Sequence, residues 1–126
     1  MIVVLVTLVA GALGAGLRFV VARVFRSPWA VLLVNAVGSG LGGLFYGLAV
    51  VGNVGDDALL VLLGGFCGGL TTFSTFGVET IQLVLAGRGR LAVLSVAGNL
   101  VLGIGAAALA FGAVILLRLG TPRTGR

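Results

Sequence analysis

Four long apolar stretches constrain the fold of this chain more than any other feature of its sequence. They cover residues 2–21, 29–51, 58–86 and 91–117 of the 126. A helix needs about 20 mostly apolar residues to cross a bilayer, and each stretch is long enough. The first lacks a basic leading segment and contains Arg18, so we interpret it as a retained helix rather than a signal peptide. The sequence predicts an all-α membrane protein in which residues 1–126 form a single four-helix transmembrane domain.

The composition supports lipid as the main solvent and excludes several classes of function. Hydrophobic residues make up 60% of the chain and charged residues 9%, against about a quarter charged in soluble domains. The 23 glycines suit membrane helices, where small residues let backbones approach closely. The chain has no histidine, and Cys67 is its only cysteine, so imidazole catalysis and an intrachain disulfide are excluded. Nothing in the sequence supports an enzyme.

Arginine carries all the basic charge, and the net charge is +5. A basic chain can bind nucleic acid, but most of these arginines flank apolar stretches, which is typical of membrane anchoring. No nucleic-acid partner is therefore predicted. The arginines near the membrane surfaces divide four against three between the two sides, as Arg23, Arg26, Arg88 and Arg90 against Arg118, Arg123 and Arg126. Either another signal fixes one orientation, or the protein inserts both ways and forms an antiparallel dimer.

A chain of this size has little room for a pathway of its own. Four helices pack around a core of side chains, which leaves no wide pore between them. We therefore expect a functional unit of two or more subunits.

Polar side chains inside the apolar stretches are the first candidate site residues, because polar groups in a bilayer are rare and usually functional. Arg18 either reaches toward the membrane surface or keeps a vestibule electropositive. Asn35 and Ser39 share one helical face and either bond to neighbouring helices or donate to an anion. Ser95 and Asn99 form a second, weaker stripe of the same kind.

The third stretch contains the densest cluster of unusual residues. Residues 64–76 read Gly-Gly-Phe-Cys-Gly-Gly-Leu-Thr-Thr-Phe-Ser-Thr-Phe. Glycines weaken a helix, and serine and threonine hydroxyls bend it by bonding to its carbonyls. We expect a helix broken in mid-membrane, where freed carbonyls can hold a hard cation and freed N–H groups an anion. The alternative is a kinked helix whose threonines bond back to their own backbone.

Glu79 is the only acid outside the predicted connections. It could serve as a proton-coupling group, as a residue at the mouth of a pathway, or as a side chain that reaches the membrane surface. The residues themselves leave these three interpretations open.

The chain resembles the CrcB/Fluc fluoride channel family over essentially its whole length. Residues 64–76 look nearly identical to the family signature, residues 11–19 are similar to its first-helix motif, and Asn35, Gly38, Ser39 and Gly42 fit its second-helix motif. The resemblance implies an antiparallel dual-topology homodimer, or a heterodimer of two paralogues, with two narrow pores. It also implies a structural sodium ion at the dimer interface, held by the main-chain carbonyls of Gly68 and Thr71 from both subunits.

The same resemblance implies roles for individual side chains. Phe73 and Phe76 would present ring edges to the anion, Ser74 and Thr75 would form a hydroxyl track, and Asn35 would be a donor in the pore. These five side chains would together make up most of the ion pathway.

Three further positions refine the comparison with the family. Glu79 matches an acid near one end of the hydroxyl track. Val31 stands where threonine is common, and Ser95 stands where many members have tyrosine. We therefore expect the mouths of the pores to differ in detail from those of other members.

The residues and the resemblance together predict a fluoride-selective passive ion channel of the cell inner membrane, which exports fluoride and lowers its cytoplasmic concentration. Several weak, neutral donors in series can replace the ion's hydration and still release it, and a phenyl ring has a positive edge. One alternative is a small proton-coupled exporter of the dual-topology four-helix type that uses Glu79. Another is a non-transporting scaffold, which would not need a broken helix.

Overall fold

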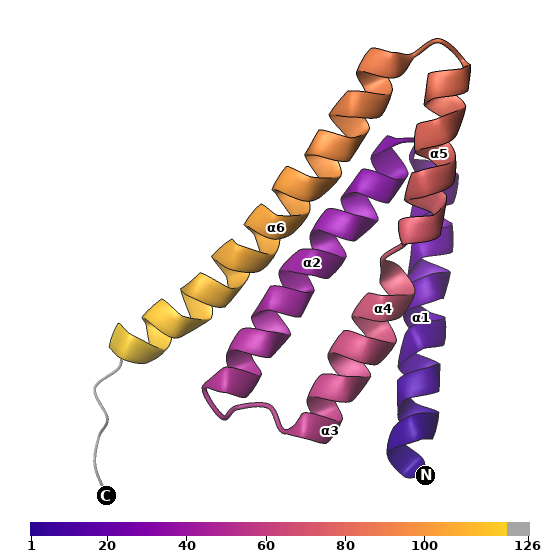
Figure 1. Ribbon diagram of the computed structural model, residues 1–126. Helices are drawn as coiled ribbons and strands as arrows, with labels where there is room; N and C mark the ends of the chain where they lie inside the picture. The colour runs from indigo at the N-terminus through magenta and orange to yellow at the C-terminus, as the bar shows by residue number, and fades with distance from the viewer. Residues whose placement is uncertain (121–126) are drawn as a thin grey trace, which may run out of the picture.

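The computed structural model describes residues 1–120, and every regular element in that range is a helix (Figure 1). Three spans are single helices: α1 (Ile2–Val24), α2 (Trp29–Val50) and α6 (Gly89–Gly120). The remaining span, Asp56–Leu85, consists of α3 (Asp56–Leu59), the π-helix η1 (Leu60–Cys67), α4 (Gly68–Leu70) and α5 (Phe73–Leu85). All four spans are long and apolar enough to cross a membrane, which confirms the prediction of an all-helical chain with four spanning helices.

Glycines end two of the helices. Gly52, just after α2, has a φ of 81°, and Gly87, just after α5, has a φ of 72°. Only glycine adopts this left-handed conformation without strain. The Gly52 N–H donates to the Ala49 carbonyl at 2.9 Å, and the Gly87 N–H donates to the Val84 carbonyl at 3.0 Å. Both connections are therefore tight turns.

The third span changes backbone conformation at Thr71 and Thr72. Helix α4 ends at Leu70, Thr71 has φ −78° and ψ 160°, and Thr72 has φ −150° and ψ 122°. Both residues are therefore extended. The Thr72 hydroxyl then accepts a hydrogen bond from the Thr75 N–H, which is the usual way that threonine begins a helix. Two extended residues thus separate α4 from α5.

Small residues bring the helices together. Helix α2 lies along α6, and α1 lies along η1 and α4 (Figure 1). A Cβ on Gly43 of α2 would lie 2.8 Å from the Ala107 Cα of α6. A Cβ on Gly69 of α4 would lie 2.9 Å from the Gly11 carbonyl carbon of α1. Such close backbone contact is typical of membrane helices, whose association gains little from hydrophobic burial.

Most large apolar side chains face outward. The core is small, and among residues 1–120 the largest side chain that is almost fully inaccessible is that of Leu70, which is 2% exposed. Leucine, isoleucine and valine side chains are exposed along all four spans. A water-facing surface would not carry so much contiguous apolar area, so lipid is the expected neighbour of these faces.

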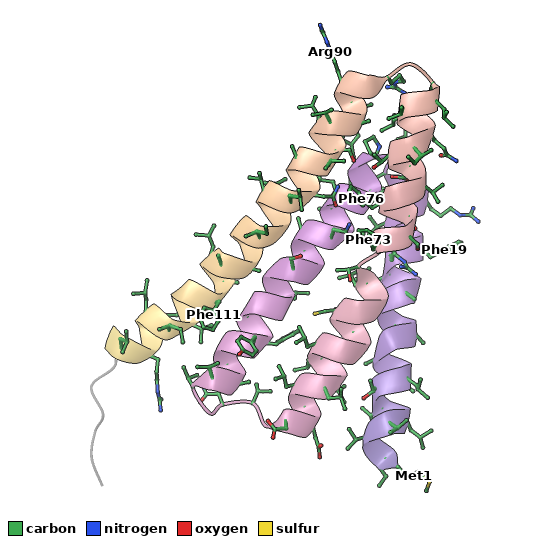
Figure 2. All side chains as sticks on the ribbon, in the orientation of Figure 1. Met1, Phe19, Phe73, Phe76, Arg90 and Phe111 are labelled. Atoms are coloured by element: carbon green, nitrogen blue, oxygen red, sulfur yellow. The ribbon has the colours of Figure 1, made fainter. Side chains whose placement is uncertain are left out.

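Four of the six arginines of the described residues gather at one end of the helices. Arg23 and Arg26 lie at the α1–α2 connection, and Arg88 and Arg90 lie at the α5–α6 connection. Figure 2 shows Arg90 projecting beyond the end of α6, far from Met1. Arg118 lies at the other end, while Arg123 and Arg126 fall outside the described residues. The predicted four-to-three division therefore stays a prediction.

Candidate functional site

The side chain of Asn35 holds the extended backbone at Thr72. Its Oδ1 accepts from the Thr72 N–H at 2.8 Å, and its Nδ2 donates to the Thr72 carbonyl at 3.2 Å. One amide of α2 thus satisfies both polar backbone groups of a residue that is 7% exposed. A carboxamide suits this task because it carries a donor and an acceptor side by side.

Asn99 extends this contact to α6. The Asn35 Nδ2 also donates to the Asn99 Oδ1 at 2.8 Å, and the Asn99 Nδ2 donates to the Ser95 carbonyl at 2.9 Å. Asn35 therefore uses both of its N–H groups on protein acceptors. Ser95 is buried and supports Asn99 through its backbone rather than its hydroxyl.

The extended backbone at Thr71 and Thr72, which interrupts the third span, changes the hydrogen-bond partners of two carbonyl groups. The Thr72 N–H bonds to Asn35, although in a continuous α-helix it would bond to the Gly68 carbonyl four residues earlier. The Thr71 carbonyl accepts from the Arg18 Nη1 at 3.0 Å. Arg18 is therefore directed inward, toward the backbone between α4 and α5.

Three hydroxyls cluster where α5 begins. The Thr72 Oγ1 donates to the Thr75 Oγ1 at 3.0 Å and accepts from the Thr75 N–H at 3.2 Å. The Ser74 Oγ lies 3.4 Å from the Thr72 Oγ1. Ser74 and Thr75 are exposed, whereas Thr72 is buried. The cluster is neutral and can rotate its protons toward a bound anion.

The two phenylalanines of α5 contact each other one turn apart. The ring centroids of Phe73 and Phe76 are 5.9 Å apart, and the rings are inclined by 48°. Phe73 is 84% exposed, and Figure 2 shows both rings directed from α5 toward the side where α2 and α6 lie. Phe73 therefore lies outside the core of this chain, and Phe76 is half-buried.

A cavity of about 440 Å³ lies on one side of the interruption. Five polar residues line it: Arg18, Ser27, Thr72, Thr75 and Glu79. One oxygen of Glu79, Oε2, is buried and has no hydrogen-bond partner among the described residues. The cavity thus brings together an inward-directed arginine, the hydroxyls of Ser27, Thr72 and Thr75, and the carboxyl group of Glu79.

A second hollow, of about 310 Å³, lies on the other side. Its polar and aromatic lining comes from three spans and comprises Asn35, Ser39, Thr71, Thr72, Phe73, Phe76 and Asn99. Thr72 lines both the hollow and the cavity. It is the one polar residue shared by the two spaces.

The structure brings most of the predicted site residues to these two spaces, but not all of them. Gly68 instead lines a third hollow, of about 370 Å³, together with Ser39 and Thr71. Ser74 and Ser95 line none of the three. Their predicted roles stay predictions.

Sequence reasoning missed two residues as members of the site. Thr72 stands at the centre of the hydrogen bonds, and the pattern Thr-Phe-Ser-Thr, in which a threonine precedes a helix, is the signal that points to it. Ser27 lines the 440 Å³ cavity from the α1–α2 connection. No pattern in the sequence distinguishes Ser27, because it lies in a connection next to a proline.

Comparison with known proteins identifies the family. Residues 5–113 match the model of the CrcB-like protein, Camphor Resistance (CrcB) family. The chain belongs to the CrcB family. Together with its four spanning helices, this membership makes it a multi-pass membrane protein.

Relatives in the CrcB family have similar lengths and share about two fifths of their residues with this chain. A fluoride-specific ion channel FluC of Nitrobacter winogradskyi is 40% identical over 103 residues, covering 76% of this chain and 82% of the relative. One from Pyrococcus furiosus is 43% identical over 101 residues, covering 76% and 82%. A fluoride-specific ion channel FluC 2 of Rhodococcus jostii is 40% identical over 113 residues, covering 86% and 95%.

Proposed function

We propose that this protein is a passive, fluoride-selective channel that exports fluoride and lowers its cytoplasmic concentration. Membership of the CrcB family and the names of the relatives support fluoride as the ion. The observation that carries the pathway is the position of Thr72, which lines two spaces on either side of the extended backbone. An ion that passes from one space to the other passes this residue.

The chemistry of the proposed pathway suits a small, strongly hydrated anion. Ser74 and Thr75 supply neutral hydroxyls 3.4 Å and 3.0 Å from the neutral hydroxyl of Thr72. Neutral donors in series replace water without trapping the ion, whereas fully charged groups in contact would hold it. The Arg18 guanidinium makes the electrostatic potential of the cavity more positive. One of its N–H groups is already used in the hydrogen bond to the Thr71 carbonyl.

Asn35 and the two phenylalanines complete the proposed pathway on the other side. Of the two Nδ2 bonds of Asn35, the one to the Thr72 carbonyl is longer, at 3.2 Å against 2.8 Å. An anion in the second hollow takes over this weaker bond and gains a donor. Phe73 and Phe76 line the same hollow, where their positive ring edges favour an anion.

We further propose that the third span is broken in mid-membrane. Thr71 and Thr72 lie near the centre of the 30-residue span Asp56–Leu85. Extended backbone is tolerated there because Asn35 and Arg18 satisfy its polar groups.

The functional unit that we propose is an antiparallel dual-topology homodimer with sodium at its centre. The carbonyls of Gly68 and Thr71 suit a sodium ion, because the first lacks its usual helical donor and the second retains a lone pair beside its bond to Arg18. Sodium bound there would be coordinated by these carbonyl oxygens and would link the two subunits. The numbered names FluC 1 and FluC 2 among the relatives make a heterodimer of paralogues the alternative.

Fluoride efflux from liposomes tests the proposed function directly. Purified protein is reconstituted with fluoride inside, and an ion-selective electrode follows its release. We expect rapid fluoride efflux, chloride efflux near that of empty vesicles, and slower fluoride efflux after sodium is removed. Fluoride release no faster than from empty vesicles, or equally fast chloride release, would refute the proposal.

Labelling from one side of the membrane tests the dual topology. Asn53 lies in the exposed α2–α3 connection, and Cys67 is buried. In the double variant Cys67→Ser/Asn53→Cys, an impermeant maleimide added outside should label about half of the molecules if both orientations occur. Labelling of nearly all or nearly none would mean a single orientation.

A further inference from the structure

An apolar groove runs between α5 and α6, next to the second hollow, with which it shares the lining residue Leu100. It has a volume of about 590 Å³, and its exposed lining is entirely apolar. The only side chain with a polar atom there is Thr80, whose hydroxyl donates to the Phe76 carbonyl at 2.8 Å. Thr80 therefore contributes only its methyl group, and the groove offers nothing to water.

The groove begins at the arginine-rich end of the molecule. Figure 1 shows α5 and α6 joined by a short turn and diverging away from it. Gly89, the first residue of α6, lines the groove at that turn, and Arg88 and Arg90 flank it in the sequence. No carboxylate of the described residues lies in either connection at this end.

We propose that this groove binds one acyl chain of an anionic phospholipid, whose phosphate is held by Arg88 and Arg90. The apolar groove suits a hydrocarbon tail, because water cannot bond to its walls. Arg88 lies between the spans Asp56–Leu85 and Gly89–Gly120, and Arg90 is the second residue of the latter, so both lie near the depth of the phosphate groups. Guanidinium groups bind phosphate with paired hydrogen bonds, and basic sites between membrane helices favour anionic headgroups.

The headgroup half of the proposal is tested by replacing the arginines. Native mass spectrometry of the protein in mild detergent compares phosphatidylglycerol with phosphatidylcholine of the same acyl chains. Arg88→Gln/Arg90→Gln should weaken phosphatidylglycerol binding by about fivefold for each charge removed, so that it binds no better than phosphatidylcholine. Arg26→Gln, which removes a charge from the other connection at the same end, should leave the preference unchanged.

The acyl-chain half is tested by filling the groove. Ala97 is exposed and lines it, so Ala97→Phe should reduce the retention of both lipids. Ala108→Phe, at an exposed α6 position that does not line the groove, is the matched control. Unchanged lipid retention in both the arginine and the Ala97 variants would overturn the proposal. So would a change of oligomeric mass in Ala97→Phe without loss of lipid, because a second copy of the chain would then occupy the groove. The result does not depend on fluoride transport.

Discussion

The carboxamide of Asn35 hydrogen-bonds to both backbone polar groups of Thr72, at 2.8 Å to the N–H and 3.2 Å to the carbonyl. The two residues come from different spans and are separated by 37 positions. Buried backbone groups without hydrogen-bond partners would be costly in a membrane. The Asn35 side chain therefore replaces the helical hydrogen bonds that satisfy the backbone elsewhere in the span. Stability and ion passage should therefore depend on the same amide.

Asn35→Asp should impair both properties. The carboxylate keeps an acceptor for the Thr72 N–H but loses the donors to the Thr72 carbonyl and to Asn99. Each orphaned acceptor should cost about 1–3 kcal/mol of unfolding free energy, and a negative charge in the pathway should slow fluoride efflux about tenfold or more. Melting temperature and liposome efflux measure the two effects. Asn53→Asp, the same change in the exposed α2–α3 connection, should alter neither.

Thr72→Val tests the hydroxyl that begins α5. It keeps the shape of the side chain but removes the acceptor for the Thr75 N–H and the donor to the Thr75 Oγ1. Loss of such a cap should lower stability by about 1 kcal/mol and slow fluoride efflux, whereas Thr72→Ser should retain most of both. Thr80→Val removes a hydroxyl that bonds only to its own helix and should have little effect on efflux. Equal efflux in Thr72→Val and the wild type would contradict the proposed role.

Phe73→Ile should separate transport from folding. Phe73 is 84% exposed in the chain, so the substitution removes little packing within the subunit. It also removes a ring edge, and such contacts contribute on the order of 1 kcal/mol, so fluoride efflux should fall at least about threefold. Phe111→Ile should lower stability and leave fluoride efflux unchanged, because Phe111 stacks on Tyr46 at 5.9 Å outside the pathway. A scaffold protein would show no transport effect for either substitution.

Glu79→Gln distinguishes a channel from a coupled exporter. The described part of α1 and α2 contains no acid, and Glu79 is the acid that lines the 440 Å³ cavity. A passive channel exchanges no proton, so Glu79→Gln should still release fluoride, and wild-type efflux should be the same with and without an imposed pH gradient. Efflux that follows the pH gradient in the wild type and disappears in Glu79→Gln would support the exporter.

The sequence predicted the spans well and their ends less well. Hydropathy and length are local properties, so four stretches sufficed to predict four spanning helices. Helix α1 continues to Val24, and α6 covers Gly89–Gly120, because backbone hydrogen bonding continues past the last apolar side chains. The π-helical turns of η1 (Leu60–Cys67) have no comparable signal, since they differ from α-helix by a small shift in hydrogen-bond partners.

The sequence indicated candidate site residues but not their arrangement. Polar groups within apolar stretches pointed to Asn35, Asn99 and Arg18. Which backbone groups they contact depends on how the helices cross, and that is fixed by close approaches such as Gly43 on Ala107. No local pattern in the sequence encodes those crossings. The bond from Asn35 to Thr72 therefore emerged only from the structure.

Substitutions at Ser27 and Val31 test whether fluoride passage through the 440 Å³ cavity needs a hydroxyl beside α2. The α2 residues that line it are Ala30, Val31 and Val34, so α2 contributes an apolar wall to the cavity that Thr75 also lines. Ser27, in the connection that precedes α2, supplies a hydroxyl to the same cavity. Ser27→Ala should slow fluoride efflux by about two- to fivefold, which corresponds to the loss of one hydrogen bond of about 1 kcal/mol.

Val31→Thr, added to Ser27→Ala, should restore efflux, because it places a hydroxyl on the same wall one helical turn away. Threonine and valine have nearly the same shape, so a rescue would be due to the hydroxyl rather than to volume. Ser27→Thr should behave as the wild type. If Ser27→Ala conducts fluoride normally, the α2 side of the cavity needs no hydrogen-bond donor and the α5 hydroxyls suffice. If Val31→Thr fails to rescue a slow Ser27→Ala, the position of the hydroxyl at the cavity mouth matters more than its presence.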